Sequence, residues 1–309
     1  MGDFVENPAA SSGASLPRAW RVAGAALGFT VEQVAQGLTG LKALDALIVM
    51  AVNQANIALL TRDTDARYAY GGLSAPAPDE SRRPVSIHAI AMSMQLPFET
   101  VRRRIHQLEE IGACRQEARG VIVPGAYLSS PAYLQDVLRA HGRMRRLHEE
   151  LSSQDLIDPL PASNYLPTDE APVRAAARLL SDFLLRIADT LMRRTQDPVS
   201  GLILGAVIVA SLGGGPADGI SASEAARRLG LAGETVRRRL AQLQADGHCQ
   251  RRPQARYAIP VAPGDPAWEP LIGELAATVQ RLMAGLAERG VIESWTNPAS
   301  AEAQRGLAS

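Results

Sequence analysis

The chain has little of what metal or redox chemistry requires. Its 309 residues include only two cysteines, Cys114 and Cys249, and neither has other metal ligands at the usual spacing. Both occupy equivalent places at the start of a predicted strand, where a small buried apolar side chain fits. We therefore expect no metal site, no cofactor and no redox role.

Charge of one sign is also missing. The 32 basic and 32 acidic residues give a formal net charge of +0, so attraction to nucleic acid would have to come from local clusters. Lysine is almost absent, because Lys42 is the single lysine among those 32 basic residues. Such a bias is typical of GC-rich coding, and an arginine here is informative only through its place in a motif.

Long apolar runs and enzyme signatures are absent as well. The most apolar run, residues 202–212, is too short to span a bilayer, and the acidic start of the chain lacks the basic region of a signal peptide. We expect a cytoplasmic protein with no membrane partner. No glycine-rich phosphate loop, metal-binding His-Glu spacing or nucleophile motif occurs, which argues against an enzyme.

What the chain does contain is an internal repeat. Residues 99–104, Glu-Thr-Val-Arg-Arg-Arg, recur letter for letter at 234–239, 135 residues later. The same offset aligns Ala91 with Ala226, Gly112 with Gly247 and Cys114 with Cys249. A match of this extent at one fixed offset indicates a duplicated unit.

Each copy has the pattern of a helix-turn-helix. Around Val101 the apolar residues recur at steps of three and four, which is typical of a helix with one buried face. A shorter apolar helix precedes it, at 86–94 in the first copy and 221–229 in the second. Only three residues separate the two helices in each copy, and such a tight connection predicts a helix-turn-helix. The second turn begins at Gly230, whereas the first has Gln95, which suits the turn less well.

A short basic hairpin follows each predicted helix-turn-helix. The helix pairs span 86–111 and 221–246, and the hairpins, or wings, span 113–124 and 248–260. At 231–247, Leu-Ala-Gly-Glu-Thr-Val-Arg-Arg-Arg-Leu-(x)2-Leu-(x)3-Gly, the sequence resembles bacterial winged helix-turn-helix transcription regulators of the GntR, Crp and MarR kind. The resemblance covers the helix pair and wing of each copy and implies a fold rather than a particular regulator.

The duplicated unit extends beyond the winged helix. Each copy is expected to add a leading helix, a core helix and a trailing helix, the first leading helix starting at Pro17 and breaking near Gly28. Each trailing helix is expected to start at a proline, Pro131 or Pro266. The predicted fold is mainly α with small β-hairpin wings, the two copies being related by a pseudo-two-fold axis. The predicted boundaries are a disordered 1–15, a first unit at 16–151, a linker at 152–170, a second unit at 171–290 and a flexible tail at 291–309.

The first copy contains about twenty residues that the second lacks, at 61–80. Asp63, Asp65, Tyr68 and Tyr70 within it could suggest a metal or ligand. A surface loop is the favoured interpretation, and a contact with an effector or protein partner is the alternative. Because loop length costs little, we expect that deleting it leaves the fold intact.

DNA binding offers a specific mechanism for the repeat. A helix fits the major groove, where base edges present distinguishable donors and acceptors. In the regulators that the chain resembles, the Thr-Val-Arg-Arg start of the second helix meets that groove, and arginines on the wing hold phosphate or minor groove. The resemblance therefore implies DNA contacts by Thr100, Arg102, Arg103, His106, Arg119, Thr235, Arg237, Arg238, Arg251 and Arg252.

The function expected from these features is a sequence-specific, nucleoid-associated transcription regulator that binds double-stranded DNA through two recognition helices in one chain. Its site would be an imperfect inverted repeat, with half-sites about ten base pairs apart. The active form would be a pseudo-dimeric monomer or a homodimer. A replication initiator and a chromosome-associated interaction scaffold remain alternatives, and each arginine triplet could instead be a solvated face with internal salt bridges.

Overall fold

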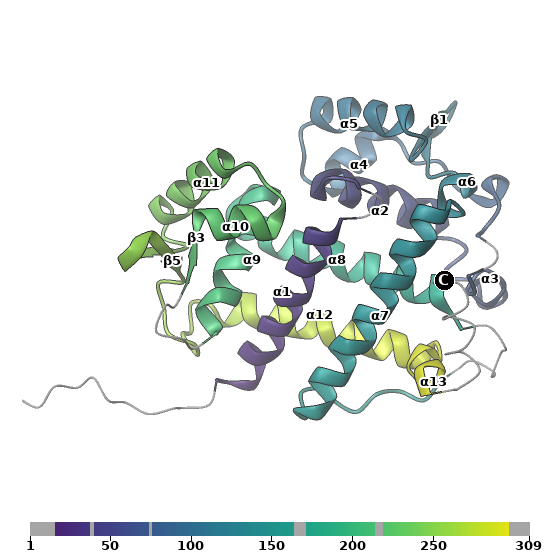
Figure 1. The fold of residues 1–309 in the computed structure, drawn as a ribbon. Coiled ribbons are helices and arrows are strands. Elements are labelled where there is room, and N and C mark those ends of the chain that lie inside the picture. The colour runs from purple at the N-terminus through teal and green to yellow at the C-terminus, as the bar shows by residue number, and fades with distance from the viewer. Residues whose placement is uncertain (1–15, 38–39, 74–75, 164–170, 214–218, 297–309) are drawn as a thin grey trace, which may run out of the picture.

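The computed structural model describes residues 16–37, 40–73, 76–163, 171–213 and 219–296. Within these ranges the molecule is mainly helical and contains two small antiparallel sheets (Figure 1). The expectations for 1–15, for 164–170 in the linker and for 297–309 lie outside the described residues. No single described helix is both long enough and apolar enough to cross a membrane. Two consecutive helices, Val173–Thr195 and Pro198–Leu212, reach that length and apolar character only when taken together, and they are bent by 98° relative to each other.

The first half of the chain begins with a long helix and continues through a head of short elements to another long helix. Its elements are α1 (Arg18–Gln36), α2 (Ala43–Ile57), α3 (Thr64–Ala69), η1 (Asp79–Ser81), α4 (Ile87–Ser93), α5 (Phe98–Glu110), β1 (Arg115–Glu117), β2 (Gly120–Ile122), α6 (Gly125–Leu128) and α7 (Pro131–Ser153).

The second half has a similar order, without equivalents of α3, η1 and α6 and with β3, η2 and α13 in addition. Its elements are α8 (Val173–Thr195), α9 (Pro198–Leu212), β3 (Ile220–Ser221), α10 (Ala222–Leu229), α11 (Gly233–Ala245), β4 (Gln250–Arg252), η2 (Pro253–Ala255), β5 (Arg256–Ala258), α12 (Glu269–Glu288) and α13 (Val291–Thr296). We call residues 85–124 the first head and residues 220–260 the second head.

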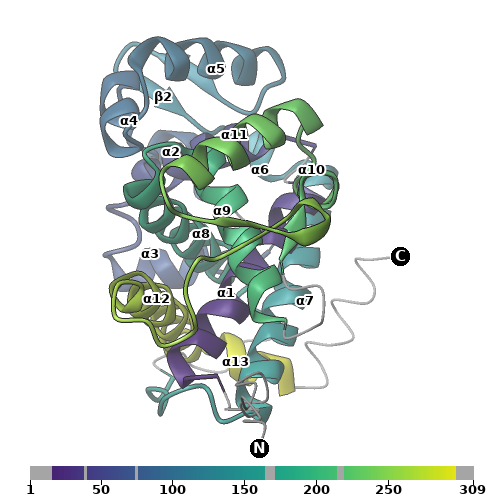
Figure 2. The same cartoon turned by 90° about the vertical axis from the view of Figure 1, so that its left-hand side faces the viewer.

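Long helices form the body of the molecule and carry both heads on one side. In Figure 1, α12 runs across the lower part of the molecule and α5 and α11 lie along the top. Helices α1 and α7 run between these two levels. The view turned by 90° again places α5 and α11 together at the top, away from α12 and α13 (Figure 2). The second helix of each helix-turn-helix therefore lies on the same side of the molecule.

The leading helix of the first half packs on the second half. Helix α1 packs mainly against α9 and α12, which belong to the second half, and α8 packs against α2 and α7 of the first half as well as its own neighbours. The indole Nε1 of Trp20 donates to Glu269 Oε1 at 3.3 Å, and the rings of Phe29 and Phe183 meet edge to face at 5.9 Å. Neither half therefore has a complete core of its own.

Small residues allow these central helices to approach closely. A Cβ placed on Gly24 of α1 would lie 3.0 Å from Leu212 Cδ1 of α9, and one placed on Gly285 of α12 would lie 2.9 Å from Leu179 Cδ2 of α8. Replacing either glycine would force the neighbouring leucine to move. Gly24 thus fixes the distance between helices of different halves, and Gly285 fixes the distance between two helices of the second half.

The buried apolar side chains form one large core and two smaller ones. The large core joins α1, α7, α8, α9 and α12 to the second head, including Val236 and Leu240 of α11. The first head has a separate core in which Val101 and Ile105 of α5 pack on Ile48 of α2. The second head is therefore continuous with the body of the molecule, whereas the first is seated on α2.

Three sequence expectations about helix boundaries are wrong. Gly28 does not break the leading helix, because α1 runs without interruption from Arg18 to Gln36. The second trailing helix starts at Glu269, and Pro266 lies in the preceding turn. The tail is helical at 291–296, where Trp295 is buried and its Nε1 donates to His141 Nε2 at 2.8 Å.

The insertion at 61–80 is not a plain surface loop. The carbonyl oxygen of Gly71 accepts hydrogen bonds from the backbone nitrogens of Arg174 and Ala175 at 2.9 and 3.1 Å, and Arg174 Nε donates to the Leu73 carbonyl at 2.9 Å. Asp79 accepts a hydrogen bond from the backbone nitrogen of Gly125 at 2.7 Å. The segment therefore joins the first head to the start of α8. Asp63 caps α3, and no group of three metal-ligating side chains occurs among the described residues.

Candidate nucleic-acid interface

The second head is closed by a cap and a tight turn. Ser221 Oγ accepts from the backbone nitrogen of Glu224 at 3.2 Å, and Glu224 Oε2 accepts from the backbone nitrogen of Ser221 at 2.9 Å. This reciprocal capping box fixes the start of α10. Gly230 ends the helix with φ 61°, in the left-handed region that glycine adopts at little cost.

The first head makes the same turn without glycine. Gln95 has φ 51°, close to the value at Gly230. The backbone nitrogen after each turn residue donates back to the preceding helix, from Leu96 to Ala91 O at 3.0 Å and from Leu231 to Ala226 O at 3.0 Å. The left-handed conformation costs a non-glycine residue roughly 1–2 kcal/mol, so the packing of α4 on α5 evidently outweighs that cost.

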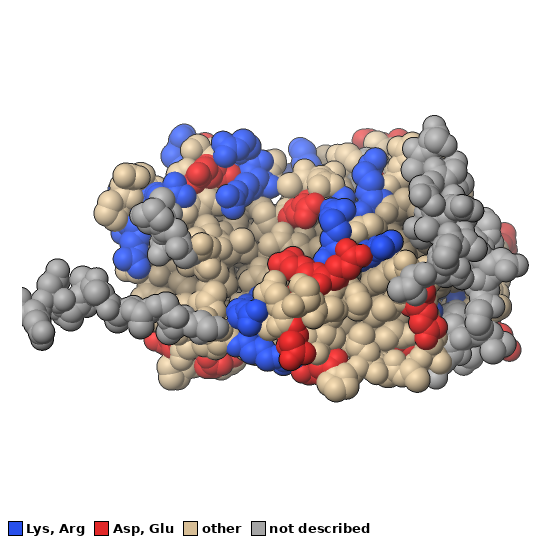
Figure 3. Space-filling view, turned by 60° about the horizontal axis from the view of Figure 1, so that its bottom comes forward, with Lys and Arg blue, Asp and Glu red and all other residues tan. Residues whose placement is uncertain are grey.

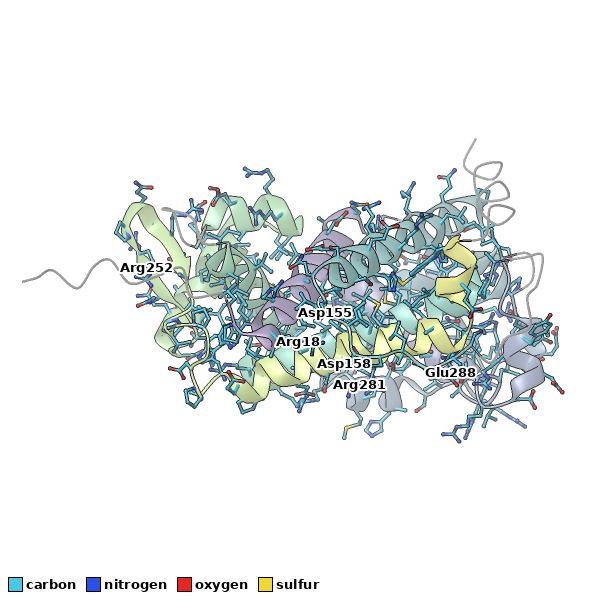
Figure 4. All side chains as sticks on the ribbon, turned by 90° about the horizontal axis from the view of Figure 1, so that it is seen from below. Arg18, Asp155, Asp158, Arg252, Arg281 and Glu288 are labelled. Atoms are coloured by element: carbon cyan, nitrogen blue, oxygen red, sulfur yellow. The ribbon has the colours of Figure 1, made fainter. Side chains whose placement is uncertain are left out.

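The hairpins pair with the start of their own heads. Strand β1 pairs with β2 and Val85 bridges Val121, while Ile220 of β3 pairs with Tyr257 in the order β3-β5-β4. Val85 and Ile220 are repeat-equivalent, so the same connection recurs in both heads. Exposed arginines lie on both hairpins, Arg119 on the first and Arg251 and Arg252 on the second. In Figure 4, Arg252 projects from one end of the molecule.

Both cysteines are buried at the bases of the hairpins. Burial raises the pKa of Cys114 to about 12 and that of Cys249 to about 11. A thiol with so high a pKa is almost entirely protonated at neutral pH and is a poor nucleophile. Their environment is that of small apolar side chains in a core.

The third arginine of each repeated triplet holds its helix in place. Arg104 pairs with Asp45 at 2.6 Å, and Arg239 pairs with Asp197 at 3.1 Å. Both carboxylates lie at the start of a core helix, in the first turn of α2 and at the N-cap of α9. These half-buried pairs lock α5 and α11 in the same orientation on their core helices, and they direct the first two arginines away from the body.

The predicted contact residues on α5 and α11 are accessible. Arg102, Arg103, His106, Arg237 and Arg238 are exposed, and the two threonines, Thr100 and Thr235, are half-buried. The structure therefore brings the predicted residues of each head to one face of a helix beside a hairpin.

Acidic neighbours partly neutralise these arginines. Glu99 pairs with Arg102 at 2.8 Å, Glu234 pairs with Arg237, and His106 lies 3.8 Å from Glu110. The side chains of both arginine pairs are more than 60% exposed, so each pair contributes little to stability and phosphate can displace the acid. Five other arginines of the two heads form no ion pair within the described part of the chain: Arg103, Arg119, Arg238, Arg251 and Arg252.

The first hairpin is bound to its recognition helix by Glu109. Its carboxylate accepts hydrogen bonds from the backbone nitrogen and from the side-chain amide of Gln116, at 2.8 and 2.7 Å. These bonds lower the pKa of Glu109. They hold β1 beside α5, and a shallow groove lined by Thr100, Arg103 and His106 lies between them.

Sequence reasoning missed two exposed arginines on the first helix of the second head. Arg227 and Arg228 lie on α10, where the first head has Met92 and Ser93 at the equivalent positions. Figure 3 shows basic side chains gathered over the second head, whereas the rest of that face carries charges of both signs. Aligning the repeat by charge as well as by apolar residues would have found this difference.

Comparisons of the chain with protein-family models, with curated proteins and with solved structures gave no match. The geometry of the two heads therefore carries the functional argument.

Proposed function

We propose that the protein is a sequence-specific transcription regulator that binds double-stranded DNA through two winged helix-turn-helix units in one chain. The observation that supports this most strongly is the repeated triplet: in both heads one arginine is anchored to the body and two are exposed beside a threonine. Such a pattern is expected if the exposed pair has a common ligand, because stability alone requires only the anchored arginine.

DNA fits this arrangement for two further reasons. Exposed arginines on a helix can contact guanine edges and phosphates in the major groove, while arginines on a hairpin can contact the neighbouring backbone. The recognition helices α5 and α11 also lie on one side of the molecule (Figures 1 and 2), as binding to two half-sites on one face of a duplex requires. A single chain would then act as a pseudo-dimer located on the nucleoid.

The zero net charge favours a regulator over a replication initiator, for which we expect a strongly basic chain. The exposed arginines on both heads argue against a role confined to protein interaction.

The test is selection of bound duplexes from a randomised library, followed by measurement of affinity for the enriched sequence. The expected product is an imperfect inverted repeat with half-sites about ten base pairs apart. The variant with both Arg103→Ala and Arg238→Ala should lose this binding. Arg281→Ala is the matched control, because Arg281 is exposed on α12, on the underside away from both heads (Figure 4).

A reporter promoter carrying the enriched site distinguishes regulation from the alternatives. Expression should change with the unaltered protein and not with the double variant. Failure to enrich any sequence would contradict sequence-specific binding. Enrichment of one isolated half-site would contradict the use of both heads.

A further inference from the structure

A cavity of about 230 Å³ lies between the two halves of the molecule, among α1, α2, α7, α8 and α9. Most of its lining is apolar, with Leu47, Met50, Val137, Leu184 and Leu202 among the contributing side chains. Protein interiors are normally packed with few voids larger than a water molecule. An apolar space of this size at the junction of two halves is therefore a candidate binding site.

One cation at this cavity makes no direct ion pair. Arg143 of α7 is only 6% exposed, and its guanidinium donates to the side-chain oxygens of Gln33 and Gln36 on α1. Among the described residues it forms no ion pair, although the carboxylates of Glu32 and Asp136 also act on it electrostatically, and Asp136, which lines the cavity, pairs with Arg139. A buried charge whose hydrogen bonds go to neutral amides is costly, and an anion in direct contact would lower that cost.

We propose that the cavity binds a small monocarboxylate with an apolar body, the carboxylate lying against Arg143. An engineered apolar cavity of about 150 Å³ accommodates benzene, so a cavity of about 230 Å³ has room for a body of roughly eight to nine carbons. This site is distinct from the 61–80 segment and lies at the centre of the molecule.

The cavity also touches the base of both heads. Arg104 of α5 and Leu231, which precedes α11, are part of its lining. Arg104 is the residue that anchors α5 to Asp45. A ligand in the cavity would therefore alter the spacing of the two recognition helices. This regulatory consequence rests on the proposed DNA binding, whereas occupation of the cavity does not.

The test is titration calorimetry of the full chain with octanoate, octanol and octylammonium in the absence of DNA. Octanoate should bind once per chain. Octanol, which has no charge, should bind about ten- to a hundredfold more weakly, because a hydrogen bond to a charged group contributes roughly 1.5–3 kcal/mol. Octylammonium should bind no better than octanol.

Two variants test whether the ligand binds in this cavity. Arg143→Gln should reduce octanoate affinity to that of octanol and leave octanol binding unchanged. Ala188→Leu adds bulk to the lining and should weaken both ligands, and Arg281→Ala should change neither. Circular dichroism and thermal melting establish that each variant is folded, and the ligand series on the unaltered protein does not depend on any variant.

Several results would overturn the proposal. These are the absence of binding by all three ligands, equal affinity for octanoate and octanol, or octanoate binding that is unaffected by a folded Ala188→Leu variant. The coupling is measured separately, as a shift in DNA affinity with octanoate present. If the protein without octanoate does not bind DNA, the proposed function is contradicted, whereas the assignment of the cavity as a ligand site still holds.

Discussion

The two heads should divide the work of DNA binding, since their free positive charge differs. The second head contains eight arginines, of which Arg237, Arg239 and Arg256 are paired with acids, leaving five. The first head contains five arginines, and its paired residues Arg102, Arg104 and Arg115 leave two. The second head should therefore supply most of the phosphate binding.

The salt dependence of affinity measures this difference. Each neutralised phosphate adds about 0.9 to the slope of log affinity against log salt concentration, so the unpaired arginines alone correspond to slopes of about 4.5 for the second head and about 1.8 for the first. Changing Arg237 and Arg238 together to alanine should weaken binding to all DNA and reduce the slope by about one to two. Loss of Arg237 also leaves Glu234 unpaired, which adds repulsion against phosphate.

The matching change of Arg102 and Arg103 to alanine should cost specific binding more than non-specific binding. Fluorescence anisotropy over a salt series, on the selected duplex and on a random duplex of equal length, measures both effects. Arg281→Ala reports the effect of removing an exposed arginine from the opposite side of the molecule.

Equal slopes for the two double variants would refute the division of labour. Unchanged affinity in both would refute DNA binding through α5 and α11 altogether.

Three further predictions concern buried side chains and the inserted segment. Burial lowers the pKa of His141 from 6.5 to about 4, so on acidification His141 is protonated in the unfolded chain before it is protonated in the folded protein. The free energy of unfolding should therefore fall as the pH drops from about 6.5 towards 4, by at most ~1.4 kcal/mol per pH unit. Urea denaturation at pH 7 and pH 5 should show a smaller difference for His141→Gln, and an unchanged difference would contradict this assignment. The thiols of Cys114 and Cys249 should react with a thiol reagent only after denaturant is added, and rapid labelling of the native protein would contradict their burial. Deleting residues 61–80 should lower the thermal midpoint, because the backbone nitrogens of Arg174, Ala175 and Gly125 and the Arg174 guanidinium lose the acceptors that this segment supplies; an unchanged midpoint would restore the surface-loop interpretation.

The helix pairs were predictable from the sequence because their signals are local. The apolar spacing around Val101 and the Ser221–Glu224 cap act within a few residues, and both appear in the structure. Gln95 shows the limit of such rules. The preference for glycine applies to an isolated turn. In the folded protein, the hydrogen bond from the Leu96 backbone nitrogen to the Ala91 carbonyl and the packing of the two helices hold Gln95 in the same conformation.

Contacts between distant segments were not predictable in the same way. The apolar stripe of α1 shows that one face is buried, but it does not show that the partner is α9 and α12 rather than α2 and α7. The packing of Trp295 against His141 likewise joins residues 154 apart in sequence. Of the candidate site, the exposed arginines follow from periodicity, whereas the anchoring of Arg104 and Arg239 required the positions of Asp45 and Asp197 in space.

The packing of α1 on helices of the second half also sets an order for biosynthesis. Trp20 and Leu27 of α1 leave the ribosome early, yet the helices that bury them, α9 and α12, begin at Pro198 and Glu269. At a synthesis rate of about 5–20 residues per second, the apolar face of α1 waits roughly ten to fifty seconds for its partners. During that interval the nascent chain exposes the apolar face of α1, which makes it a natural client for chaperones that act at the ribosome.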